Sequence, residues 1–112
     1  MFVDLLDIAR DESRHLRWLV ERLKEHDSYY GAIPAHEGLW NDCLKTKHDL
    51  SARLAIVPLV QEAKALDSAP RLTEKLNSAS DHSSAAILQQ ICDEEVGHVY
   101  KGLRWFTFLC DS

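Results

Sequence analysis

Two glutamate–histidine pairs in this sequence have a spacing that suits metal binding. Glu12 and His15 form one Glu-x-x-His pair near the N-terminus, and Glu95 and His98 form a second pair near the C-terminus. Residues three apart on a helix lie on the same face, one turn from each other. A carboxylate and an imidazole placed in this way can bind one metal ion together.

Both pairs interrupt apolar stripes that would otherwise face the interior of a helix bundle. Steps of three and four residues give a first stripe through Leu5, Ile8, Glu12, His15 and Leu19. The same steps give a last stripe through Leu88, Ile91, Glu95, His98, Gly102, Trp105 and Leu109. A middle stripe carries a single glutamate and runs through Ala55, Leu59, Glu62 and Leu66.

These polar residues together predict a di-metal site. Two Glu-x-x-His pairs with additional inward glutamates are the ligand pattern of di-iron and di-manganese carboxylate bundles. Mixed oxygen and nitrogen ligands suit iron or manganese and chemistry with dioxygen. We expect Glu62 and one or both of the paired glutamates to bridge two ions, with one histidine on each ion. The predicted metal ligands are Glu12, His15, Glu62, Glu95 and His98.

Each of these residues taken singly has an ordinary explanation. A histidine on an apolar stripe is often a hydrogen-bonded core residue, and a glutamate there often buries only its stem. Buried carboxylates without cations cost several kcal/mol each, and arginines such as Arg14 offer compensation without a metal. Glu94 competes with Glu95 as a ligand, although the stripe favours Glu95. Asp11 and Asp93 either accept hydrogen bonds from the ligand imidazoles or lie on solvated helix faces.

The elements that must position these residues are all helical. Apolar periodicity predicts helices over residues 2–27, from a cap at Thr46 or Asp49 to Leu66, over 71–77 and over 84–109. The last of these helices is expected to start at Asp81 or Ser83. A connection over 28–47, with a short helical turn near 37–44, joins the first two helices. Pro58 is expected to kink the second helix, and residues 67–70 to break it. The predicted fold class is therefore all-α, with three long helices.

Length and composition narrow the classes of function. The chain has 112 residues and a formal net charge of −5, which predicts one domain over residues 1–112 and disfavours a general nucleic-acid binder. The apolar stretches are too short to span a bilayer, and no signal peptide is visible. Cys43, Cys92 and Cys110 lack a CxxC spacing, which predicts reduced thiols in a cytoplasmic protein.

Specific motifs are spread over nearly the whole chain: ARDESRH at 9–15, YGAIPAHEGLW at 30–40, HDLSARLA at 48–55, VPLVQEA at 57–63, DEEVGHV at 93–99 and GLRWF at 102–106. These motifs resemble a ferritin-like family, the domain of unknown function four-five-five. The resemblance implies a ferritin-like bundle with metal ligands at Glu12, His15, Glu62, Glu95 and His98. It also implies kinship with ferritin-like oxidases and hydroxylases, including a tRNA-modifying hydroxylase.

The resemblance further implies an upstream helix that carries one more inward glutamate. This sequence starts at Met1, with what would be the second bundle helix, and the 28–47 connection matches the crossover of such bundles. Without the upstream helix we expect the site to lack a carboxylate and an apolar groove to stay open. The sequence is then a truncated product or a fragment, or a second copy of the chain covers this groove.

Two functions from different classes follow. The first is a di-metal carboxylate protein, either an oxygen-dependent oxidase or hydroxylase for a small substrate, or an iron-oxidising protein. The second is a non-catalytic helical interaction or assembly module that has lost its metal. Metal content distinguishes the two.

Overall fold

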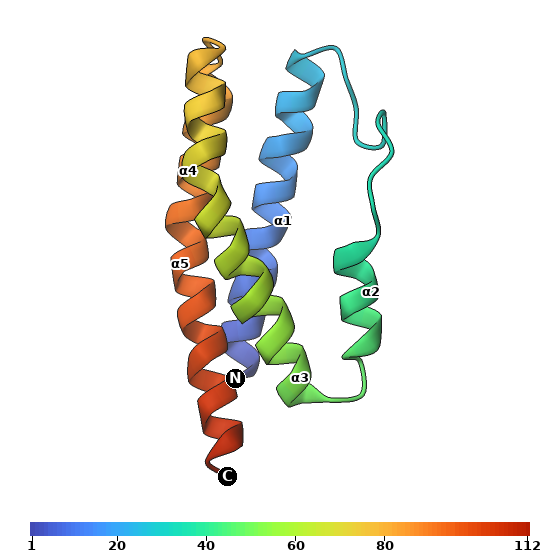
Figure 1. The fold of residues 1–112 in the computed structure, drawn as a ribbon, viewed down its shortest axis with the longest axis vertical. Helices are drawn as coiled ribbons and strands as arrows, with labels where there is room; N and C mark the ends of the chain where they lie inside the picture. Colours follow the sequence, from blue (N-terminus) through green and yellow to red (C-terminus); the bar gives the residue numbers. More distant parts are fainter.

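The computed structural model describes residues 1–112 and is helical throughout its regular structure (Figure 1), which confirms the all-α prediction. The elements in chain order are α1 (Phe2–Glu25), α2 (Gly38–Lys45), α3 (Leu50–Leu54), the π-helical segment η1 (Ala55–Gln61), α4 (Glu62–Ser78) and α5 (His82–Cys110). Because α3, η1 and α4 follow one another without a break, residues 50–78 form one continuous helical run.

Two aspartates start helices at the predicted places. The side chain of Asp49 accepts a hydrogen bond from the backbone N–H of Ala52 at the start of α3. Asp81 accepts one from the backbone N–H of Ser84 at the start of α5. An N-cap oxygen satisfies a backbone donor that has no partner inside the helix. Both caps therefore fix where the site-bearing helices begin.

The two prolines of the middle run behave differently from the predictions. The structure has a π-helical turn at Pro58 in place of a simple kink, since a wider turn tolerates the missing donor. The predicted break over 67–70 is wrong, because α4 continues through Pro70 to Ser78. Pro70 is exposed, so water can satisfy the carbonyl that loses its partner.

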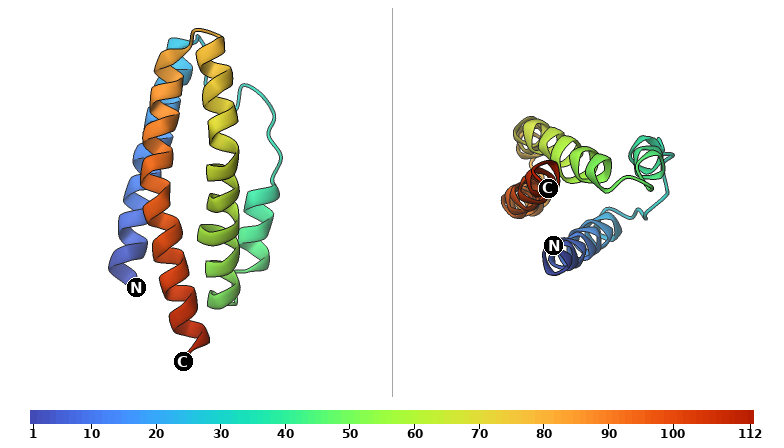
Figure 2. Two further views of the ribbon diagram at one scale, coloured as in Figure 1. Left: turned by 60° about the vertical axis from the view of Figure 1, so that its left-hand side comes forward. Right: turned by 90° about the horizontal axis from the view of Figure 1, so that it is seen from below.

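The long helices form an elongated bundle of 49 × 25 × 23 Å. α1 and the 50–78 run point the same way, and α5 returns antiparallel to both (Figures 1 and 2). α5 packs along α4 and η1 and also against α1, whereas the connection after α1 runs down the outside and carries α2. No helix has a stretch long and apolar enough to cross a bilayer.

Polar contacts hold α1 against α5 at both ends. Near the top, the Arg22 guanidinium donates to Asp81 at 2.6 Å and to Ser84 Oγ at 2.8 Å. Near the bottom, the Trp105 indole N–H donates to Asp4 at 2.8 Å. The middle of the helix pair is thereby held at a fixed separation.

The buried interior is unusually polar. The buried apolar side chains are Leu54, Pro58, Ala69 and Ala85, whereas the buried polar side chains are His15, Thr46, Glu95 and His98. Buried polar groups cost free energy unless they are paired or bind a ligand. Three of these four polar residues lie at the mid-level of the bundle, where an ordinary core would be apolar.

Candidate metal centre

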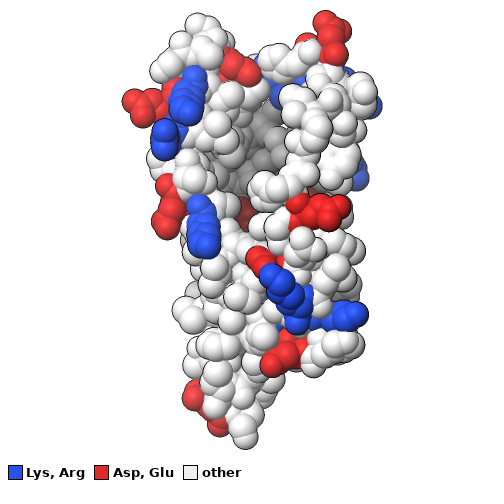
Figure 3. Space-filling model, turned by 45° about the vertical axis from the view of Figure 1, so that its right-hand side comes forward, with Lys and Arg blue, Asp and Glu red and all other residues white.

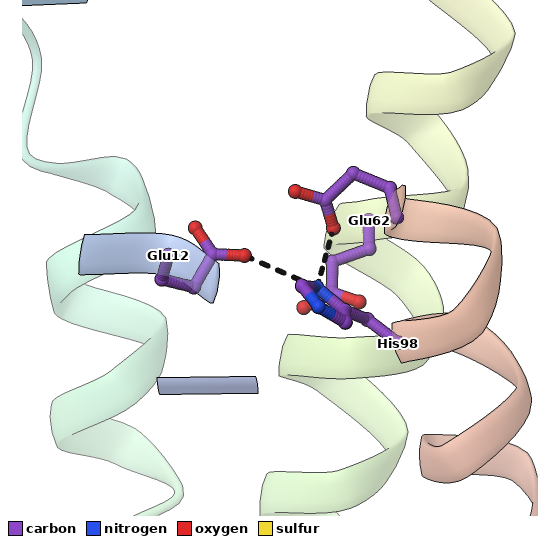
Figure 4. A group of neighbouring side chains, drawn as sticks. Glu12, Glu62 and His98 are labelled. Carbon is purple, nitrogen blue, oxygen red and sulfur yellow. Dashed lines mark hydrogen bonds and ion pairs between the residues drawn. The ribbon is translucent and has the colours of Figure 1, made fainter. Parts of the chain in front are cut away.

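Four predicted ligands converge at the centre of the bundle. Glu12 from α1, Glu62 from α4, and Glu95 and His98 from α5 each offer one ligand atom, and these atoms all lie within 4.8 Å of one another. Figure 4 shows Glu12, Glu62 and His98 reaching one point from three helices. His98 Nδ1 lies 3.0 Å from Glu95 Oε2 and 3.2 Å from Glu12 Oε1. We call these four residues together with His15 the central cluster.

His15 stands at the edge of this group. Its side chain is buried, and its Nδ1 lies 3.2 Å from Glu95 Oε1 and 3.8 Å from Glu12 Oε1. The two imidazole rings are 6.0 Å apart, centre to centre. All five predicted residues are thus brought together, with one histidine at each side of the shared carboxylates.

The far nitrogen of each imidazole contacts an acid from the opposite helix. His98 Nε2 on α5 lies 3.3 Å from Asp11 Oδ2 on α1. His15 Nε2 on α1 lies 2.8 Å from Glu94 Oε2 on α5. A carboxylate that accepts from Nε2–H orients the ring and leaves Nδ1 for a metal. Both histidines therefore present Nδ1 to the inside of the central cluster.

The structure distinguishes the two roles that the sequence left open for Asp11 and Asp93. Asp11 is an acceptor for an imidazole, whereas Asp93 is exposed and accepts only from the Gln89 amide on the same helix. Glu94 occupies the outer position beside His15 and is not one of the four converging ligands. Sequence reasoning missed this role of Glu94, although both motifs share the pattern acid-Glu-x-x-His. Alignment of the two motifs would have found it.

The inner carboxylates of Glu12, Glu62 and Glu95 lie so close together that each disfavours the charged form of its neighbours. Burial, and then the negative charges of Glu95 and Glu12, raise the pKa of Glu62 from 4.5 to about 8. Desolvation and the charge of Glu95 likewise raise the pKa of Glu12. Glu12 and Glu95 contact the imidazoles of His15 and His98, and no lysine or arginine forms an ion pair with Glu12, Glu62 or Glu95. A bound cation would relieve this repulsion.

The outer acids have the opposite environment. The hydrogen bond with His15, followed by the contacts with Arg14, lowers the pKa of Glu94 despite its partial desolvation. For Asp11, desolvation is outweighed by the hydrogen bonds with His98 and Arg14, so its pKa is also lowered. Both outer acids are therefore held ionised, which suits them as hydrogen-bond acceptors for the imidazoles.

Two orphaned polar atoms test whether the residues fit a metal. His15 Nδ1 and Glu62 Oε2 are buried side-chain atoms without a hydrogen-bond partner in the protein. Both belong to the central cluster, and such atoms are rare in folded proteins unless they serve a ligand. Imidazole nitrogen with several carboxylate oxygens is a donor set for iron or manganese. The residues present therefore fit such an ion.

The π-helical segment helps to place Glu62, the first residue of α4. A Cβ added at Gly102 would lie 2.7 Å from Pro58 Cβ and 2.9 Å from Pro58 Cγ. Only glycine lets α5 approach the proline so closely. Pro58 and Gly102 thereby fix the helical turn that precedes Glu62. π-Helical turns are frequently found beside functional sites.

A cavity of about 460 Å³ lies between the upper halves of α1, α4 and α5. Its apolar wall consists of Leu19, Leu23, Leu72, Leu76, Ile87 and Leu88, and Arg22, His26 and Asp81 also line it. Leu19 follows His15 by one helical turn, so the cavity and the cluster share the same inner helix faces. Figure 3 shows the surface hollowed in this upper half of the molecule.

The chain was also compared with known proteins. The sequence profile of the family described as "Protein of unknown function (DUF455)" matches residues 1–112. The chain belongs to this family. An "Uncharacterized protein" from Haemophilus influenzae is 43% identical over 106 residues, which is 95% of this chain and 37% of the relative. The chain thus spans little more than a third of that relative's length. No solved structure matches the chain.

Proposed function

We propose that this member of the family is a ferritin-like di-metal carboxylate protein that binds two iron or manganese ions. The metal ligands would be Glu12, His15, Glu62, Glu95 and His98. The observation that carries the proposal is the pairing of two acid-Glu-x-x-His motifs across α1 and α5, with Glu62 facing both. The orphaned His15 Nδ1 and Glu62 Oε2 support it.

We also propose that the fold is a ferritin-like bundle. In such bundles, a long crossover makes two helices parallel, and ligands project inward from facing helices. α1 and the 50–78 run are parallel, and the crossover between them contains α2. Each of the two lies antiparallel to α5, which contributes the second motif. These relations support a ferritin-like arrangement of the site.

The proposed activity is an oxygen-dependent oxidation of a small organic substrate. Reduced iron or manganese ions at this position would supply electrons to dioxygen. Glu12, Glu62 and Glu95 would hold the metals, while Asp11 and Glu94 fix the two imidazoles. The leucine-lined cavity offers an apolar surface for an organic substrate, and its volume falls in the range of small-molecule sites. This cavity favours an oxidase or hydroxylase over an iron-oxidising protein, which needs no organic pocket.

We also propose that a second copy of the chain covers the open side of the cavity. Leu19 and Leu72, which line the cavity, keep 46% and 48% of their surface exposed. Exposed apolar surface of this kind marks a contact site.

The three unpaired cysteines suit a reducing compartment, and we therefore propose that the protein is cytoplasmic.

The metal content of the purified protein tests the proposal. Protein produced in iron- and manganese-supplemented medium is analysed by elemental mass spectrometry, alongside the double variant Glu95→Ala/His98→Ala. The expected result is about two ions per chain in the wild type and loss of bound metal in the variant. A metal-free wild type that stays folded and dimeric would instead support the non-catalytic assembly module. Unchanged metal in the variant would refute the ligand assignment.

A further inference from the structure

We propose that Arg14 is a positioning residue that fixes both metal-binding histidines at once by joining the acids behind them. This inference rests on the proposed di-metal function and deepens it. Arg14 is the third residue of the Glu12–His15 motif, so it projects from the same stretch of α1 as the ligands themselves.

The contacts form one continuous chain across the two helices. Arg14 Nη1 lies 3.0 Å from Asp11 Oδ1, and its Nη2 donates to Glu94 Oε2. The other oxygen of Asp11 lies 3.3 Å from His98 Nε2, and the same Glu94 oxygen lies 2.8 Å from His15 Nε2. The order is therefore His98 on α5, Asp11 and Arg14 on α1, Glu94 on α5 and His15 on α1.

The guanidinium is suited to this task because its donors form a rigid planar fork. It uses one terminal nitrogen for each acid and neutralises part of the negative charge that the two acids bring together. Its Cζ also lies 5.3 Å from the centre of the Trp18 ring, one turn further along α1. An ammonium group can carry the charge but cannot hold two acids in one plane.

Arg10 provides a matched comparison on the same helix. It pairs with Asp7 and with Asp11, at 3.5 Å and 3.7 Å, but its side chain is 71% exposed and touches no acid of α5. The side chain of Arg14 is half as exposed, at 35%, and reaches Glu94. Only Arg14 therefore connects the supports of the two histidines.

Removal of Arg14 should loosen both imidazoles without touching any metal ligand. In Arg14→Ala, two ionised acids face each other without a bridging cation, and each can rotate away from its histidine. Loss of a residue that orients metal ligands typically costs about 10–100-fold in metal affinity. We expect a loss of this size in Arg14→Ala, a partial recovery in Arg14→Lys and no change in Arg10→Ala.

The first measurement is a cobalt(II) titration of metal-free protein, followed by the visible absorption bands of the bound ion. Arg14→Ala should bind cobalt more weakly and give altered bands, because the two nitrogen ligands are no longer held in place. An affinity within twofold of the wild type, with unchanged bands, would overturn the proposal. Arg14→Gln serves in place of the alanine variant where the latter does not fold.

The second measurement needs no metal and separates this inference from the proposed function. In metal-free protein, nitrogen-15 NMR of the imidazoles should detect exchange-protected Nε2 protons on His15 and His98. These signals should vanish in Arg14→Ala or Arg14→Gln and persist in Arg10→Ala; persistence in all variants overturns the inference. A wild type that fails to bind cobalt but loses both protons without Arg14 refutes the metal function alone.

Discussion

Glu62→Gln should have opposite effects on the metal-free and metal-loaded protein. The substitution keeps the size of the side chain but removes the charge that Glu95 and Glu12 repel. In the metal-free protein, the ionised form of Glu62 is disfavoured by burial and by this repulsion. A neutral amide should therefore stabilise the metal-free fold at a pH where Glu62 is ionised in the unfolded chain, and at the same time deprive the metals of a ligand.

The magnitude follows from the raised pKa. Since the folded protein holds the Glu62 proton up to a pKa of about 8, and the unfolded chain releases it near 4.5, stability is lost as pH rises between these values. Each tenfold change in this equilibrium corresponds to about 1.4 kcal/mol, which sets a ceiling of roughly 5 kcal/mol. Because Glu62 keeps some contact with solvent, we expect about 1–2 kcal/mol.

Urea unfolding with a chelator at several pH values between 5 and 9 measures this effect. The wild type should lose stability relative to Glu62→Gln as the pH rises, and the gap should level off above pH 8. Glu74→Gln, at an exposed glutamate of the same helix, is the control and should run parallel to the wild type. A constant difference between the wild type and Glu62→Gln over this range would refute the reasoning.

The same pair of proteins should reverse its order when metal is added. A ligand that binds only the folded state stabilises it by an amount that rises with the logarithm of its concentration relative to its dissociation constant. Manganese(II) should therefore raise the unfolding temperature of the wild type and leave Glu62→Gln nearly unchanged. Equal stabilisation of the two proteins would show that Glu62 is not a ligand.

Three further predictions concern the supports of the site. Gly102→Ala places a Cβ 2.7 Å from Pro58 and should lower the free energy of urea unfolding by about 1–3 kcal/mol. Gly97→Ala, whose Cβ would have nothing within 4 Å, should not lower it. Equal effects of the two substitutions would contradict this packing argument. Asp81→Ala removes both the cap of α5 and the partner of Arg22 and should lower stability by about 2 kcal/mol, so an unchanged melting temperature would speak against it. Asp11→Asn should weaken manganese binding about tenfold, whereas Asp93→Asn should leave it unchanged. Equal manganese affinities of the two variants in calorimetry would show that Asp11 does not support His98.

Helix starts and the identity of the inner residues could be predicted because they depend on local chemistry. Asp49 and Asp81 are capping residues followed by apolar periodicity, and both cap helices in the structure. The inward positions of His15, Glu95 and His98 follow from three- and four-residue steps, which a regular helix must obey. These residues are buried as the stripes predict.

Pro58 and Pro70 show where local rules fail. Proline removes one donor, but its effect depends on whether water or a wider turn can satisfy the freed carbonyl. Pro70 is exposed and α4 passes through it, while Pro58 is buried against Gly102 and lies in a π-helical turn. Neither environment can be read from the residues around the proline, because both depend on packing and exposure.

Helical periodicity alone does not assign the crossed acids, because they depend on how α1 and α5 face each other. Glu94 and Asp93 are adjacent on α5, and only the relative rotation of the two helices decides which one meets His15. The same holds for Arg14, whose partner Glu94 is distant in sequence. Tertiary contacts between helices thus decide the outer part of the site, whereas helical periodicity decides its inner part.

An anomalous-scattering map of crystals grown with iron or manganese tests the central claim most directly. We expect a pair of metal peaks enclosed by Glu12, Glu62 and Glu95, with His15 Nδ1 on one side and His98 Nδ1 on the other. A map without peaks at this position, from crystals in which the same side chains still converge, would contradict the di-metal site.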